Sequence, residues 1–298
     1  MNLPLTACFI TPSYAPDFER CRLLCESIEK FVSPKIPHYI IVDQRDFALF
    51  QQLKNSYTSV ITKESILPWW IWRIPFLKNS WLSLKTPPIR GWLLQQLIKI
   101  GIAYHINEEI MIFVDSDVAF IRYFQVESII NNEKVRMFRD PKSIFSYMET
   151  HQKWYDTAAE LIGIDPVSFP ATDYIVQLAI WRRDNVLKLC DHLEKISGKS
   201  WIETLGSVWN LSEYVLYGIF VESILKEQSG HYYDPQDLCH PYWQDQPLSE
   251  LELQQFFDKI QPHHVAIMIS AKAGMSVQQY QELVRQINPK ATIKSFKK

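Results

Sequence analysis

Two carboxylates, Asp115 and Asp117, follow the apolar run 110–114 with a single serine between them. An apolar run of this length, rich in β-branched residues, predicts a buried strand. On an extended chain, side chains two residues apart point to the same side. Carboxylate oxygens bind Mg²⁺ and Mn²⁺, and these ions also bind phosphates. The pattern therefore predicts a metal site for a phosphorylated ligand, with a turn or a helix cap as the structural alternative.

Other residues that follow predicted strands, or precede a predicted helix, could complete such a site. Tyr14 can stack on a base, Asp43 can accept hydrogen bonds from a base or ribose, and Arg90 can pair with a phosphate. In an open α/β sheet the carboxyl ends of the strands face one crevice, which would bring these side chains together. Asp and Thr at strand ends also cap helices, so a structural role stays open for each. The residues predicted on this basis are Thr11, Pro12, Ser13, Tyr14, Asp43 and Arg90.

Hydrophobic periodicity predicts the elements that must position these residues. In the first half strands alternate with helices, which is typical of a mostly parallel sheet flanked by helices. Its predicted strands are 5–10, 39–42, 59–61 and 110–114, and its helices are 18–31, 47–53 and 92–104. The second half is richer in helix, with helices 143–161, 185–196, 213–226, 249–260 and 277–287 and strands 174–181 and 264–269. We expect the two halves to share one sheet.

Composition excludes several classes of protein. The 298 residues carry a formal net charge of -2, which gives no basic field for nucleic acid. The eight glycines never form a Gly-x-Gly, which excludes a P-loop and the usual dinucleotide fingerprint. Five cysteines without CxxC spacing argue against a disulfide framework or a zinc ribbon. With no recognisable signal peptide or long apolar segment, we expect a cytoplasmic protein.

Segment 67–82 is unusual because it holds four of the ten tryptophans. Its prolines, Pro68 and Pro75, oppose a long helix. Three interpretations stay open for it. The segment could be an irregular cover over the core, an acceptor-binding loop, or a peripheral contact with the inner face of a membrane, since Trp favours positions with one wet edge.

Several motifs, taken in order, resemble a known family. They are Thr11-Pro12-Ser13-Tyr14, Asp43, Ile89-Arg90-Gly91-Trp92 with Gln95-Gln96, Phe113-Val114-Asp115-Ser116-Asp117, Ser212-Glu213-Tyr214 with Leu216-Tyr217-Gly218, and Cys239-His240-Pro241. Over about residues 5–270, this order is similar to that of bacterial nucleotide-sugar glycosyltransferases of the GT-A fold. The resemblance implies one GT-A-like (Rossmann-like) domain, with a nucleotide- and metal-binding half at 1–124 and a helix-rich acceptor half at 125–298.

The resemblance also implies the donor side of a site. The reaction would transfer a sugar from a nucleoside diphosphate sugar, with UDP favoured, and would need Mn²⁺ or Mg²⁺ as a Lewis acid for the departing diphosphate. Asp117 would be the main metal ligand, Asp115 would touch the metal-bound water or ribose, and His240 would be a third ligand. His263 and His264 compete for that last place. Gln95 and Ser116 would contact the donor.

On the acceptor side, the resemblance makes Glu213 the general base of an inverting reaction, which is preferred over retention. A carboxylate at a helix start could instead only complement the helix dipole. The acceptor would be a hydroxyl of a glycan, a glycolipid or a small metabolite. Its predicted contacts, each of which could equally be a structural residue, are Asp173, Trp181, Trp209 and Tyr214.

Two other classes of function remain open. An apolar strand followed by Asp-x-Asp also begins the phosphohydrolases of the haloacid dehalogenase type, in which the first aspartate is a nucleophile. Here that motif lies far from the start of the chain, and no later Asp-Asp pair follows a predicted strand. The third class is a protein that binds a sugar nucleotide without turnover.

Overall fold

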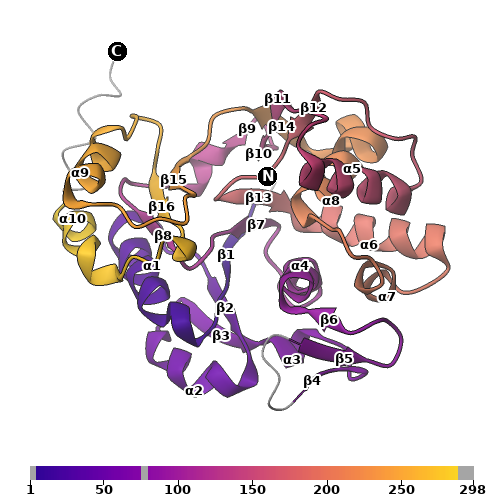
Figure 1. Cartoon of the computed structure of the whole chain (residues 1–298), viewed down its shortest axis with the longest axis horizontal. Helices are drawn as coiled ribbons and strands as arrows, with labels where there is room; N and C mark the ends of the chain where they lie inside the picture. Colours follow the sequence, from indigo (N-terminus) through magenta and orange to yellow (C-terminus); the bar gives the residue numbers. More distant parts are fainter. Residues whose placement is uncertain (1–4, 75–79, 288–298) are drawn as a thin grey trace.

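The computed structural model describes residues 5–74 and 80–287, and a five-stranded sheet lies at its centre (Figure 1). In spatial order the strands are β13 (Ala179–Arg182), β7 (Ile110–Phe113), β1 (Ala7–Pro12), β2 (His38–Val42) and β3 (Thr58–Thr62). The last four are parallel, and β13 runs antiparallel to β7. The predicted α/β class is confirmed. Because β13 comes from the second half of the chain, both halves contribute strands to this sheet.

Helices cover both faces of the central sheet, which explains why an inner strand such as β7 is apolar and buried throughout. On β7, Met111 and Phe113 join one core cluster, while Ile110 and Ile112 join another. Helix α4 (Gly91–Gly101) packs in the first cluster and α1 (Phe18–Phe31) in the second. Figure 1 shows these two helices on either side of the sheet. The loops that follow β1, β2 and β7 thus emerge between α1 and α4.

Within the described residues, four smaller sheets surround the central one. They are β15 (Cys239–Tyr242), β16 (Ala266–Ile269) and β8 (Val118–Phe120); β14 (His231–Asp234), β10 (Lys134–Phe138) and β9 (Ile130–Asn131); β11 (Asp140–Ile144) and β12 (Ala171–Asp173); and β4 (Ile71–Arg73), β5 (Ser80–Ser83) and β6 (Ile89–Arg90). The remaining α-helices are α2 (Phe47–Phe50), α3 (Lys63–Ile66), α5 (Glu149–Ile162), α6 (Arg183–Ser197), α7 (Trp201–Gly206), α8 (Glu213–Phe220), α9 (Glu250–Asp258) and α10 (Gln281–Gln286).

Some predicted boundaries in the second half are wrong. The helix predicted from residue 143 begins only at Glu149, because residues 143 and 144 belong to strand β11, which pairs with β12 about 30 residues further on. The predicted strand 174–181 is confirmed only at its end, as β13. The predicted last helix is a 3₁₀ turn followed by the short α10. The predicted helix 249–260 is present as α9, which begins with a capping box formed by Ser249 and Glu252.

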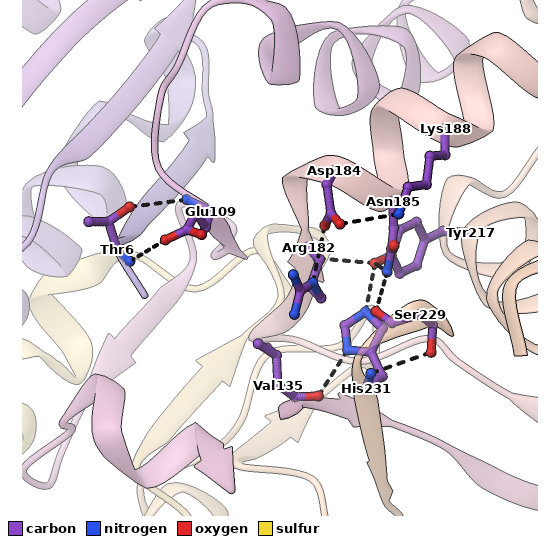
Figure 2. Close-up of polar contacts among 10 residues, drawn as sticks. All are labelled: Thr6, Glu109, Val135, Arg182, Asp184, Asn185, Lys188, Tyr217, Ser229 and His231. Carbon is purple, nitrogen blue, oxygen red and sulfur yellow. Dashed lines mark hydrogen bonds and ion pairs between the residues drawn. The ribbon is translucent and has the colours of Figure 1, made fainter. Parts of the chain in front are cut away.

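A buried polar network fixes α8 against β13 and β14 (Figure 2). The Tyr217 hydroxyl accepts a hydrogen bond from the backbone N–H of Arg182 at 3.0 Å and lies 2.7 Å from His231 Nε2. Asn185 donates to the Ser229 carbonyl oxygen at 2.8 Å, and His231 Nδ1 lies 2.9 Å from the carbonyl oxygen of Val135. Burial lowers the pKa of His231 to about 4, so the ring is neutral in the fold.

Gly218, next to Tyr217, is required by a close approach. A Cβ at this position would lie 2.3 Å from the Tyr174 ring. The Tyr-Gly pair of the α8 motif is therefore explained by packing.

The tryptophans of segment 67–82 have mixed environments. Residues 75–79 of the segment lie outside the described residues. Trp70 and Trp81 are buried, as the interpretation of a core cover expects, whereas Trp69 is 82% exposed and Trp72 is 39% exposed. Within the described ranges no helix is long and apolar enough to cross a membrane.

Candidate functional site

A cavity of about 390 Å³ lies where β1, β2 and β7 end. Its walls come from the segment after β1, from Asp43 after β2, from the tripeptide after β7 and from the first turn of α4. This is the edge at which parallel α/β sheets place their ligands. The lining residues are Pro12, Ser13, Tyr14, Asp17, Asp43, Lys63, Arg73, Trp81, Gly91, Trp92, Leu94, Gln95, Asp115, Ser116 and Asp117. We call it the strand-end cavity.

Three carboxylates lie close together on one wall of the strand-end cavity. Burial and the neighbouring Asp115 raise the pKa of Asp117 to about 7, although its Oδ2 accepts a hydrogen bond from the N–H of Ala271 at 3.1 Å. Burial also raises the pKa of Asp17, which forms an ion pair with Arg20 at 3.1 Å. Carboxylates that repel one another in a partly desolvated place favour protonation or a cation. This wall therefore has a shortage of positive charge.

The donor set fits a hard divalent cation, though it does not form a complete cage. In the part of the chain that the structure describes, no group of three or more His, Cys, Asp or Glu side chains is arranged to hold a metal. Mg²⁺ usually needs only one or two carboxylates, because waters and substrate phosphates complete its octahedron. Asp115 and Asp117 supply such a pair. Within the described residues Asp115 Oδ1 has no hydrogen-bond partner, although Lys99 Nζ lies 3.5 Å from it.

His240 is not brought to this wall. Its ring stacks on Phe256 at 4.5 Å and on His264 at 5.1 Å, between β15 and α9, and it does not line the strand-end cavity. The pKa of His240 is lowered by burial. Of the residues predicted as metal ligands, the structure brings together only the two aspartates.

The opposite wall carries cations that hold Asp43. Lys63 Nζ lies 3.5 Å from Asp43 Oδ1, and Arg73 Nη1 lies 3.2 Å from Asp43 Oδ2. Asp43 is thus already neutralised, and the two cations line the cavity with it. A ligand at this wall would meet a mixed charge pattern suited to polar edges and anionic groups.

Lys99, buried on α4, connects Asp115 of the Asp115-Ser116-Asp117 tripeptide with Glu213 at the start of α8. Its Nζ lies 3.2 Å from Glu213 Oε1, 3.5 Å from Asp115 Oδ1 and 2.7 Å from the Tyr214 hydroxyl. Burial alone would lower the pKa of Lys99, but Asp115, Tyr214 and Glu213 raise it well above its usual range. Burial raises the pKa of Glu213 against the opposing effect of Lys99. We call Lys99, Asp115, Glu213 and Tyr214 the lysine cluster.

Glu213 belongs to the lysine cluster and does not line the strand-end cavity. The backbone N–H of Glu213 donates to Gln96 Oε1 at 3.0 Å, and the Ser212 hydroxyl caps α8. Glu213 is therefore linked to the cavity-lining Asp115 through Lys99.

Aromatic rings offer a stacking surface at the cavity mouth. Tyr14 is 41% exposed and Trp92 is 46% exposed, and both line the cavity. The ring of Trp92 stacks on that of Trp154 with centroids 6.0 Å apart, which holds it in place. Stacking on such faces suits a nucleobase.

Other predicted residues lie elsewhere. The buried Thr11 hydroxyl bonds to His38 Nε2 at 2.9 Å, and Asp173 Oδ1 accepts from the N–H of Ile175 at 2.9 Å. Trp181 is a core residue, stacked on Tyr217 at 4.4 Å. Arg90 lies over the ring of the exposed Trp209 at 4.6 Å and donates to its carbonyl oxygen at 2.7 Å, outside the strand-end cavity.

Eight of the residues that line the strand-end cavity were predicted from the sequence as site residues, and others were not. The predicted site residues that line this one cavity are Pro12, Ser13, Tyr14, Asp43, Gln95, Asp115, Ser116 and Asp117. Lining residues that were not predicted include Asp17, Lys63, Arg73, Trp81 and Trp92. Lys63 directly follows β3, so the rule that found Asp43 could have found it. Asp17 directly precedes α1 and therefore appears in sequence to be a helix cap.

Comparison with known proteins identifies a family but no activity. The profile of a protein family matches residues 3–292, and that family is described as one of unknown function, DUF6492. None of the curated proteins matches the chain.

Proposed function

The chain belongs to the DUF6492 family, and we propose that it is a metal-dependent glycosyltransferase that moves a sugar from a nucleoside diphosphate sugar to an acceptor hydroxyl. The observation that carries this proposal is the paired carboxylates Asp115 and Asp117, which line a cavity at the carboxyl ends of parallel strands. Aromatic faces at the same cavity suit a base. The proposal includes a GT-A-type arrangement, for which the mostly parallel central sheet is the support.

A bound divalent ion would supply Lewis-acid stabilisation of the charge that gathers on the departing diphosphate. Asp117 and Asp115 would hold that ion, because they provide oxygen ligands on one wall. Tyr14 and Trp92 would stack on the base, and Lys63 and Arg73 would meet anionic or polar edges of the donor. UDP is favoured over GDP by the resemblance of the motifs.

We assign Glu213 a positioning role that operates through Lys99. Glu213 holds Lys99 at 3.2 Å, and Lys99 in turn holds Asp115 at 3.5 Å, so Asp115 links the lysine cluster to the cavity. General-base catalysis by Glu213, with inversion, stays a prediction from the resemblance, and it requires a conformation in which Glu213 faces the acceptor. Glu213→Gln separates the two roles. Loss of a base lowers turnover with unchanged donor affinity, whereas loss of positioning weakens metal-dependent donor binding as well.

The first test is calorimetric titration of UDP and GDP, each with and without Mn²⁺. We expect manganese-dependent binding of one nucleotide, and its loss in Asp117→Asn. Asp237→Asn is a matched control, because Asp237 also accepts a backbone N–H, from Cys239 at 2.8 Å, and its pKa is also raised by burial, to about 6. Binding of neither nucleotide in the presence of metal would overturn the proposal.

A hydrolysis assay with p-nitrophenyl phosphate completes this test. Phosphate release that disappears in Asp115→Asn would favour a phosphohydrolase. Nucleotide binding without sugar transfer to any hydroxyl acceptor would favour the non-catalytic alternative.

A further inference from the structure

A second cavity, of about 380 Å³, lies away from the strand-end cavity and shares no lining residue with it. It is bounded by the segment that follows β8, by the sheet of β9, β10 and β14, and by the turn before β16. Its volume is within the range of small-molecule sites. The lining residues are Arg122, Tyr123, Phe124, Ser128, Ile129, Arg136, Tyr232, Asp234, Leu238, Pro262, His263 and Val265. We call it the arginine cavity.

Most of the arginine cavity wall is apolar. Phe124 and Ile129 are each about 1% exposed, and Leu238 and Val265 are half-buried at the same wall. Tyr123, which is 43% exposed, adds an aromatic ring. An apolar ligand body would therefore lose contact with water on entering, which is the main source of affinity in such pockets.

The polar part of this wall is positively charged and incompletely paired. Arg136 is only 2% exposed. Its Nε donates a hydrogen bond to Asp234 at 3.0 Å, and its Nη2 donates to the carbonyl oxygen of Gln236. Its buried Nη1 has no hydrogen-bond partner within the described chain. Arg122 donates to the backbone carbonyl oxygens of Gln261 and His264 and forms no ion pair with any described residue. The lining thus contains two guanidinium groups and one carboxylate, Asp234, while Asp237, outside the lining, also interacts with Arg136.

An unpaired buried donor costs free energy that an incoming acceptor would recover. A carboxylate suits a guanidinium best, because it accepts charge-assisted hydrogen bonds. A cation would be repelled here, and an inorganic anion alone would leave the apolar wall unfilled. The wall therefore favours a ligand that carries both an apolar body and one anionic group.

We propose that the arginine cavity binds a small monocarboxylate with an apolar body. The body packs on Phe124, Ile129, Leu238 and Val265, and the carboxylate pairs with Arg122 and Arg136. This site is independent of the strand-end cavity, so the proposal stands whether or not the chain transfers sugars.

The test uses sodium octanoate as the probe, titrated by calorimetry into the full chain. Octanol lacks the charge and acetate lacks the apolar body. We expect octanoate to bind at one site per chain, with octanol and acetate each about tenfold weaker or more. Octanoate that binds no more tightly than octanol would overturn the proposal, as would the absence of binding.

Two variants locate the bound probe. Leu238→Trp fills the cavity and should weaken octanoate binding by about tenfold, whereas Ile224→Trp, an enlargement at a partly exposed residue outside the cavity, should leave it unchanged. Arg122→Gln removes the charge but keeps an N–H donor for the two carbonyl oxygens, and should weaken binding by at least about threefold. Thermal unfolding shows that each variant is folded. Binding that persists in both Leu238→Trp and Arg122→Gln places the probe elsewhere and overturns the proposal.

Discussion

Helix α8 takes part in two buried polar clusters, one turn apart, and they differ in how their charges are balanced. The lysine cluster, at the first turn, holds one cation between two carboxylates and touches the strand-end cavity through Asp115. The cluster around Tyr217 and His231 holds its side chains by neutral hydrogen bonds, and neither residue lines the strand-end cavity (Figure 2). The first cluster keeps unbalanced charge next to a cavity, whereas the buried atom left unpaired in the second, within the described residues, is a neutral acceptor, Asn185 Oδ1. Burial alone therefore does not mark a functional site, whereas unresolved charge beside a cavity does.

The largest expected effect comes from removing the cation of the lysine cluster. Lys99→Met leaves Glu213 and Asp115 without their ion pair in a buried place, and we expect the free energy of unfolding to fall by about 3–5 kcal/mol. Urea denaturation at neutral pH measures this change. The double variant Lys99→Met/Glu213→Gln should recover part of the loss. If the single variant is as stable as the wild type, the lysine cluster is not an energetic unit.

The neutral cluster should respond to pH instead. The pKa of His231 is about 4 in the fold and about 6.5 unfolded, so the unfolded chain binds the extra proton first. The stability contributed by neutral His231 is present above pH 6.5 and is lost as pH falls towards 4. From pH 7 to pH 5 we expect a loss of about 2 kcal/mol from this group. The measurement is the difference between wild type and His231→Gln in unfolding free energy at the two pH values, and parallel pH profiles would contradict the expectation.

The smallest expected effect is a change in stability on removing one carboxylate from the wall of the strand-end cavity. Asp117→Asn removes a carboxylate that is crowded by Asp115 and Asp17. Without metal at pH 8, we expect the variant to be about 1 kcal/mol more stable than the wild type, while metal-dependent nucleotide binding is lost. Added Mn²⁺ should raise the melting temperature of the wild type but not that of the variant. A less stable variant would show that Asp117 is a structural residue.

The parts of the fold that depend on local pattern could be predicted from sequence. The apolar run of β7 and the periodicity of α1 identified their elements, and the strand-end rule brought Asp43 near Asp115. Strand β11 could not be found in the same way, because its residues are polar and its stability comes from pairing with β12. Pairing across a long sequence separation leaves no periodic signal in either strand.

The candidate site, like the fold, could be predicted from sequence only where local pattern places a residue at a strand end. Lys99 was missed, because a lysine in a helix is usually exposed, whereas here it is buried and pairs with Glu213 of α8. Glu213 appeared to be a free base because sequence does not show which partner neutralises a carboxylate. His240 was placed at the metal by its position in a motif, yet its ring packs on Phe256. Side-chain partners that come from distant elements decide these roles.

The antiparallel strand β13 has a consequence for synthesis of the chain and for the behaviour of truncated fragments. Strand β7 gains its second neighbour only from Ala179–Arg182, so its outer edge stays open until synthesis has passed that point. A fragment that ends near residue 124 would present that apolar edge to other chains and should aggregate. The proposed nucleotide binding by the first half should therefore be tested in chains that keep β13, and a nascent chain needs protection from self-association until this strand emerges.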